Sequence, residues 1–207
     1  MTLSILHLTL FANNRYFLDH ENTTVGEKPF TDSSVEMVDM VNATFGDDGG
    51  LMKSCHDGLL ERGMDVRLCI MAEHVIEFVK TPVFAFNSKF DSFQLENILQ
   101  AYNFTDDNDR EADLQYGVDF VEQLQPLMDD SKNGAFITSC ICHGCPWEAL
   151  QIDGKNSFAH YGQWVDEVIN GDGGGGGESH FTIDASVEPN GGPDAAVSDG
   201  YQKCEAF

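Results

Sequence analysis

Residues 81–99, TPVFAFNSKFDSFQLENIL, indicate the fold because they join a buried strand to an acidic turn and a helix. Residues 81–87 form a short apolar run that opens with a proline, a composition typical of a buried parallel strand. Asp91 follows in a turn, and the helix is expected over residues 91–99. Functional groups of α/β sheets lie at the carboxyl ends of strands, so Asp91 is a candidate functional carboxylate.

The same arrangement recurs at residues 134–141, GAFITSCI, where a predicted strand runs out towards His143. An acid and then a histidine, each just past a strand end, match the order of the last two triad members of an α/β-hydrolase. In such a triad the carboxylate fixes the imidazole tautomer and stabilises the imidazolium that forms during the reaction. By position alone, Asp91 also fits a helix N-cap or a solvated turn.

Outward from these two segments, the pattern of apolar residues predicts an α/β fold with a mainly parallel sheet. The expected strands are residues 3–11, 81–87 and 134–141. The expected helices are residues 35–45 capped by Ser33 or Ser34, 51–69, 72–79, 91–99, 114–128 and 157–169. Residues 1–170 are expected to form the domain. Residues 171–207 are expected to be a glycine-rich acidic linker or disordered tail, with Phe181, Ile183 and Tyr201 available for docking.

Both strand-end segments resemble the pectin acetylesterase and Notum family. FNSKFDSFQLENIL is similar to the family segment N-x-x-[YF]-D-x-[WF]-Q-x-x-N, and GAFITSCICHGC is similar to G-x-F-x-x-S-C-x-x-H-C. The matching residues are Asn87, Phe90, Asp91, Phe93, Gln94 and Asn97, then Gly134, Phe136, Ser139, Cys140 and His143. RYFLDHEN, near the start, and the pair Cys55 and Cys69 are less specific matches. The resemblance covers about residues 8–170 and implies the C-terminal half of an α/β-hydrolase fold.

The family removes acyl groups from oxygen esters with a serine on a G-x-S-x-G elbow and an oxyanion hole. The resemblance implies that His143 is the general base and acid and that Asp91 is its orienting carboxylate. Polysaccharide O-acetyl groups, such as those of pectin, are the leading substrate, because the segment around Asp91 is closer to the acetylesterase pattern. No G-x-S-x-G occurs in the sequence. The expectation is therefore a truncated chain that is inactive alone, with a non-catalytic fragment or pseudoenzyme that acts as a binding module as the alternative.

The cysteines allow several pairings. The resemblance pairs Cys55 with Cys69. A second disulfide is expected to involve Cys145 or Cys140, and Cys204 is either a sixth partner or a free thiol. Two residues depart from the family pattern, Gly144 between His143 and Cys145, and Cys142 before the histidine. Both departures affect local geometry.

Neither of two possible metal sites is well supported. Cys140, Cys142, His143 and Cys145 are zinc-ligand types, but four ligands within six residues cannot easily surround one ion. Residues 129–134 imitate the first half of an EF-hand loop, yet its twelfth position would hold Cys140 in place of glutamate. We therefore expect no metal and no cofactor. His160 lies in a predicted helix and His180 in the glycine-rich linker, so both are weaker catalytic candidates than His143.

Charge and cysteine content restrict the partners and the compartment. The 35 acidic and 11 basic residues give a net charge of -24, which argues against nucleic acids and anionic membrane surfaces. No segment is long enough to span a membrane. Six cysteines and sequons at Asn22, Asn42 and Asn103 favour a secreted protein or the endomembrane lumen. The opening residues lack a basic n-region, so we expect any signal peptide to be missing from this sequence. A half-domain would expose one edge of its sheet and self-associate.

Overall fold

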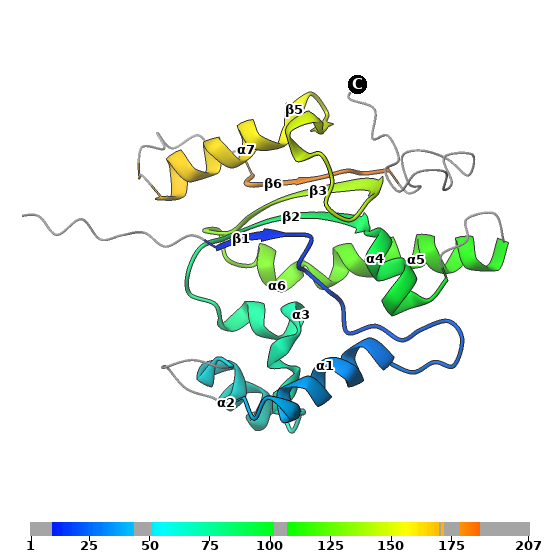
Figure 1. Cartoon of the computed structure of the whole chain (residues 1–207). Coiled ribbons are helices and arrows are strands. Elements are labelled where there is room, and N and C mark those ends of the chain that lie inside the picture. The colour runs from blue at the N-terminus through cyan, green and yellow to red at the C-terminus, as the bar shows by residue number, and fades with distance from the viewer. Residues whose placement is uncertain (1–9, 44–50, 102–106, 170, 172–178, 187–207) are drawn as a thin grey trace, which may run out of the picture.

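A four-stranded parallel sheet forms the centre of the computed structural model, which describes residues 10–43, 51–101, 107–169, 171 and 179–186 (Figure 1). The strand order is β1-β2-β3-β6, and each neighbouring pair is parallel. The strands are β1 Leu10–Asn13, β2 Val83–Phe90, β3 Gly134–Ile141 and β6 Phe181–Ile183. A separate antiparallel pair joins β4 Gln151–Ile152 to β5 Lys155–Asn156.

Helices cover both faces of the sheet, as Figure 1 shows. One face carries α7 Ser157–Trp164, which continues as a π-helical turn Val165–Ile169. The other face carries α4 Ser92–Gln94, a π-helical turn Leu95–Leu99, α5 Asp107–Gln123 and α6 Gln125–Met128. With both faces covered, β2 is buried along its whole length and β3 is buried up to Cys140. This explains why their sequences show continuous apolar runs and no alternation.

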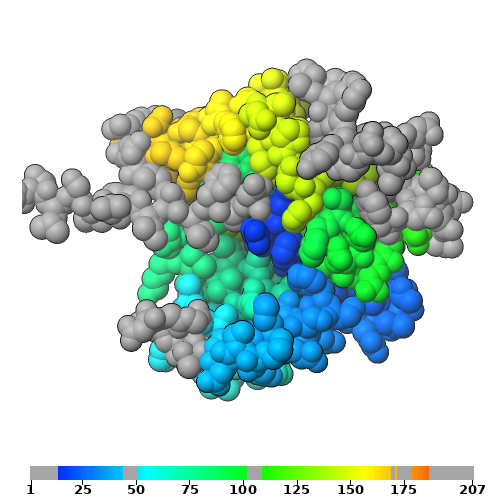
Figure 2. Space-filling view, in the orientation of Figure 1, coloured from blue at the N-terminus to red at the C-terminus, as the bar shows by residue number. Residues whose placement is uncertain are grey.

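A helical layer lies beyond the second face of the sheet, on the opposite side of the molecule from α7 (Figures 1 and 2). It contains α1 Pro29–Met40, α2 Lys53–Glu61, a 3₁₀ helix Val66–Ile70, α3 Ala72–Val75 and a second 3₁₀ helix Ile76–Phe78. A disulfide joins Cys55 to Cys69, and both cysteines are buried with Leu59 in a cluster of their own.

Two glycines allow close approaches that set the layers. A Cβ at Gly117 of α5 would lie 2.6 Å from the ring of Phe90, so the glycine lets α5 pack directly under the end of β2. A Cβ at Gly134 would lie 2.6 Å from the ring of Phe84 and 3.0 Å from the carbonyl oxygen of His180. Gly134 therefore makes room where the chain enters β6 beside β3.

The predicted strand over residues 134–141 has the observed bounds, and the strand expected over residues 81–87 is displaced to 83–90. The predicted helix over residues 35–45 is wrong at its start. It begins at Pro29, because proline lacks only an N–H that the first helical turn leaves unbonded in any case. Ser34 caps nothing there; its hydroxyl donates to the carbonyl oxygen of Phe30 inside the helix.

Strand β6 departs from the expectation of a linker or disordered tail at residues 181–183; residues 172–178 and 187–207 lie outside the described residues. Thr182 at its centre is buried, and His160 of α7 contacts both its hydroxyl (3.3 Å) and the carbonyl oxygen of His180 (3.0 Å). Three apolar or β-branched residues thus add a strand to β3, although the preceding glycines favour no regular structure. Tyr201 lies outside the described residues, and the domain boundary near residue 170 stays a prediction.

Candidate active site

Asp91 is the first residue after β2, and its side chain has no exposed surface. One of its oxygens accepts a hydrogen bond from the backbone N–H of Gln94 (3.1 Å), so Asp91 is the N-cap of α4. The helix-cap interpretation and the functional interpretation are therefore compatible, because a carboxylate has a second oxygen and further lone pairs to offer. The sharp change from strand to helix holds the carboxylate at the carboxyl edge of the sheet.

His143 lies two residues beyond the end of β3, the strand next to β2. Its Nδ1 atom is 3.0 Å from both carboxylate oxygens of Asp91. The imidazole is 41% exposed, whereas Asp91 is fully covered. Among the described residues Asp91 is the one hydrogen-bond partner of His143, and it uses Nδ1 and not Nε2. A parallel sheet brings these residues together because its strand ends share one edge.

The Asp91 carboxylate is electrostatically unusual. Burial raises its pKa above the ordinary value, and the hydrogen bond from His143 opposes that rise. Tyr116 of α5 also has a pKa well above its usual range, first through burial and then through the negative charge of Asp91. The phenol therefore stays neutral and donates to Oε1 of Gln94 (2.9 Å).

Asn87 and Gln94, which belong to the segment that resembles the family around Asp91, hold residues 14–20 beside His143. Asn87 accepts from the backbone N–H of Tyr16 (3.3 Å), and Gln94 accepts from that of Leu18 (3.2 Å). Between these two anchors lies Phe17, whose ring stacks on His143 at a centroid distance of 6.3 Å. Phe93 lies at 5.3 Å from the same imidazole. Phe17 was not predicted as a site residue, although it lies within the RYFLDHEN match.

A disulfide forms at Cys145, one of the two cysteines expected to take part in a second disulfide, and its partner is a residue that the expectation did not name. Cys145 bonds to Cys142, which the sequence analysis had treated as a local departure from the family pattern. Cys140 is disulfide-bonded as well, and Cys204 lies outside the described residues. None of the three therefore offers a thiolate to zinc, which removes the basis of the zinc alternative. The EF-hand resemblance has a structural explanation too, because Asn133 is buried and its side chain bonds to Val83 and Leu127.

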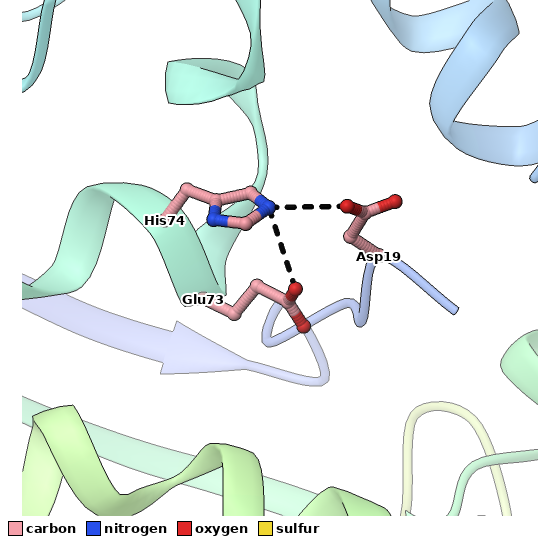
Figure 3. Close-up of side chains that lie close together, drawn as sticks. All are labelled: Asp19, Glu73 and His74. Carbon is pink, nitrogen blue, oxygen red and sulfur yellow. Dashed lines mark hydrogen bonds and ion pairs between the residues drawn. The ribbon is translucent and has the colours of Figure 1, made fainter. Parts of the chain in front are cut away.

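Among the described residues, Asp19, Glu73 and His74 are the group whose side chains could hold a metal ion (Figure 3). Nε2 of His74 lies 3.2 Å from Asp19 and 3.4 Å from Glu73. Asp19 also pairs with the ammonium of Lys28 (3.1 Å) and accepts from the hydroxyl of Thr31 (2.7 Å).

The pKa values of the two acids in this group are shifted in opposite directions. Burial disfavours the charged form of Asp19, but hydrogen bonds from His74, Thr31 and Lys28 hold its pKa well below the usual range. Burial raises the pKa of Glu73. The contacts form an ion-pair network that fastens the segment carrying Phe17 to α1 and α3.

A parallel sheet with helices on both faces, and with an acid and then a histidine beyond adjacent strand ends, has the arrangement of the α/β-hydrolase fold. The family model described as Pectinacetylesterase matches residues 11–167, and the chain belongs to this family. The fold is similar to two crystal forms of the Wnt deacylase Notum from Drosophila, with TM-scores of 0.67 and 0.68 and 16% sequence identity in both. The matches cover 86% and 88% of this chain but 46% and 48% of the Notum chain, so the chain spans less than half of that structure. A search of curated proteins finds no match.

A helix that crosses a membrane must be both long and apolar. None of the helices in the described ranges combines the length and the apolar character that crossing a bilayer requires.

Proposed function

We propose that Asp91 and His143 are the acid and the base of a serine esterase that removes acyl groups from oxygen esters. The observation that carries the proposal is the 3.0 Å contact between Nδ1 of His143 and the buried carboxylate, at the ends of neighbouring strands. Membership of the pectinacetylesterase family supports an acyl-ester substrate. Polysaccharide O-acetyl groups are the substrates that we infer.

The geometry assigns each nitrogen of the imidazole a task. Asp91 accepts a hydrogen bond from the N–H group at Nδ1, which leaves the lone pair on Nε2, the ring nitrogen that does not bond to Asp91. Nε2 takes the proton of the attacking serine and later returns it to the departing sugar hydroxyl. Because Asp91 is fully buried, its attraction for the resulting imidazolium is weakly screened by water. Water then releases the acyl group from the serine with the same histidine as base.

The nucleophile is proposed to come from a segment outside the 207 residues, because the sequence contains no G-x-S-x-G. Strand β1 lies at an edge of the sheet in the described part of the chain, where a further strand can pair. A strand added there would end at the same edge as β2 and β3 if it ran parallel to them. The matches cover less than half of the Notum chain, which agrees with a nucleophile that comes from a segment outside the 207 residues.

The decisive experiment extends the chain with the in-frame genomic segment upstream of Met1, provided that this segment encodes a serine elbow. Release of acetate from acetylated pectin and from a small acetyl ester is then measured. We expect turnover that His143→Ala abolishes. Asp91→Asn should lower it by about 10³- to 10⁴-fold, because an amide supports the wrong imidazole tautomer. The 207-residue chain alone should not react with a fluorophosphonate probe for activated serines.

A second histidine–carboxylate pair provides matched controls. His20 and Asp119 lie 3.1 Å apart and are partly exposed, but neither follows a strand. His20→Ala and Asp119→Asn should leave turnover close to that of the parent protein. Wild-type turnover in both His143→Ala and Asp91→Asn would show that neither residue belongs to a triad.

A non-catalytic fragment or pseudoenzyme is the second candidate, and the missing serine elbow is the observation that favours it. Such a protein would bind acylated polysaccharide without hydrolysing it. If the upstream genomic sequence encodes no elbow, binding of acetylated and deacetylated pectin by the chain as given distinguishes this function. The disulfides of the chain support a secreted protein or the endomembrane lumen in either case.

A further inference from the structure

We propose that the Cys142–Cys145 disulfide is a positioning element that holds His143 against Asp91. This inference rests on the proposed function, since it concerns the residue assigned as the base. It assigns a role to the two positions at which the chain departs from the family pattern, Cys142 and the inserted Gly144.

The disulfide closes a small ring around the histidine. Cys142 directly precedes His143, and Cys145 follows after Gly144, with a Cα–Cα distance of 5.4 Å. Gly144 has a φ of 76°, the left-handed region that favours glycine. A Cβ at Gly144 would meet no atom within 4 Å, so the glycine serves the backbone conformation and not the available space. The disulfide and the glycine together fix a tight turn just after β3.

One end of this ring is anchored in the core. Cys145 is 6% exposed and packs in the cluster that contains Phe86 and Trp147. Its carbonyl oxygen accepts from the backbone N–H of Trp147 (2.8 Å). Cys142 is only partly buried. The disulfide therefore connects the residue before the histidine to a rigid part of the α7 face.

Few other contacts restrain the backbone of the histidine. In the described part of the chain, the backbone hydrogen bonds outside helices and strands include none of His143 or Gly144. The imidazole itself contacts Asp91 and the rings of Phe17 and Phe93. With β3 on one side and the disulfide on the other, the backbone of His143 is held at both ends. Without the disulfide, Gly144 would allow the turn many conformations.

The test measures the imidazole tautomer in the 207-residue chain labelled with nitrogen-15 in histidine. Long-range nitrogen–proton spectra at about pH 8.5, where an ordinary imidazole is neutral, show which ring nitrogen carries the proton. In the wild-type protein we expect His143 to be protonated on Nδ1 alone, because Asp91 accepts a hydrogen bond from the N–H group at that nitrogen. In Cys142→Ser/Cys145→Ser we expect His143 to lose this single tautomer and to show the mixture of Nδ1–H and Nε2–H tautomers that a solvated histidine has.

The matched control is Cys55→Ser/Cys69→Ser, which removes a disulfide in the helical layer of α1 to α3. We expect it to lower the melting temperature and to leave the His143 tautomer unchanged. A merely structural role of Cys142–Cys145 would affect melting without a selective change at His143. If the double variant at 142 and 145 keeps the wild-type tautomer, or if the control loses it too, the proposal is wrong.

Limited reduction of the wild-type chain provides a second measurement in case the double variant does not fold. Dithiothreitol gives two electrons and two protons to the disulfide and becomes a cyclic disulfide itself. Alkylation and peptide mapping identify preparations in which Cys142 and Cys145 are opened and Cys55 and Cys69 remain bonded. These preparations should show the same loss of the Nδ1–H tautomer, and an unchanged tautomer would overturn the proposal.

The tautomer measurement does not depend on turnover. An extended protein that lacks esterase activity although His143 is protonated on Nδ1 would contradict the proposed function and leave the positioning role intact. Conversely, the extended protein could be active while its Cys142→Ser/Cys145→Ser variant keeps the wild-type tautomer and kcat. That result would contradict the positioning role alone.

Discussion

Two fully buried aspartates, Asp91 and Asp113, differ in how their charge is compensated. Asp91 has His143 and the backbone N–H of Gln94 as partners. Asp113 of α5 has no exposed surface, and neither of its oxygens has a hydrogen-bond partner among the residues that the structure describes. Burial, and then repulsion from Asp109, raises the pKa of Asp113 to about 8. A compensated carboxylate can act in catalysis, whereas an uncompensated one weakens the fold whenever it ionises.

We predict that Asp113→Asn raises the stability of the protein at neutral and alkaline pH. Between about pH 4, where an unfolded aspartate titrates, and about pH 8, the folded state binds a proton that the unfolded state has lost. The free energy of unfolding therefore falls as the pH rises through this window. Asparagine does not ionise, so the variant should gain about 1 to 3 kcal/mol near pH 8.

Urea unfolding of both proteins across this pH range checks the prediction. Asp153→Asn is the control, since Asp153 is exposed in the turn between β4 and β5, and asparagine tolerates its φ of 51°. Equal pH slopes for wild type and Asp113→Asn would contradict the assigned cause.

At the scale of elements, β6 and the helical layer are held by contacts between residues far apart in the sequence. The ammonium of Lys89, on the buried strand β2, donates to the backbone carbonyl oxygens of Asp184 (2.9 Å) and Ser186. Burial lowers the pKa of Lys89, and the charge of Asp184 partly offsets this. The hydroxyl of Ser139 on β3 donates to the same aspartate. The segment after β6 thus covers polar groups of two central strands.

We predict that residues 179–186 are required for stability, in contrast to the expectation of a linker or disordered tail over residues 171–207. A chain that ends at residue 178 should be less stable than one that ends at residue 186 by about 2 to 4 kcal/mol. The reason is that Lys89 would keep its charge beside the core without these acceptors. Both truncated chains lack Cys204, so their comparison isolates β6 and its contacts. Identical urea midpoints would show that β6 contributes nothing.

The disulfide between Cys55 and Cys69 should stabilise the helical layer. It closes a loop with a sequence separation of 14, for which the chain-entropy model gives about 3 kcal/mol. We expect Cys55→Ser/Cys69→Ser to lower the free energy of unfolding by this order. Urea denaturation of the oxidised proteins measures the difference. A midpoint within error of the wild type would indicate that the reduced loop stays ordered through its buried Leu59.

At the scale of the whole molecule, an open sheet edge and a large negative charge oppose each other. Strand β1 has a pairing partner on one side only among the described residues, and an unpaired edge favours association. The net charge of -24 resists it by repulsion between copies.

We therefore predict self-association that increases with salt. Sedimentation velocity of the 207-residue chain at low and high ionic strength should show larger species at high salt, because screening weakens the repulsion. The Debye length falls from about 30 Å at 0.01 M to about 8 Å at 0.15 M salt. A protein that stays monomeric at both ionic strengths would contradict the prediction.

The sequence alone determined those features that depend on local pattern. Strand β3 has its predicted bounds because the run of eight residues from Gly134 to Ile141, of which the first seven are buried, has the composition of a central parallel strand. The placement of Asp91 and His143 beyond two strand ends also followed from the sequence. The resemblance added the roles of these residues and the pairing of Cys55 with Cys69.

Only the tertiary structure decided which distant groups meet. The sequence could not predict that Nδ1 of His143 lies 3.0 Å from Asp91, that Phe181–Ile183 pairs with β3, or that Cys142 bonds to Cys145. A three-residue strand has too few residues to reveal itself by periodicity, and it exists because β3 offers a free edge. Disulfide pairing depends on Cα distance and direction, which neighbouring residues do not specify. Local sequence sets the elements, and long-range packing sets the partners.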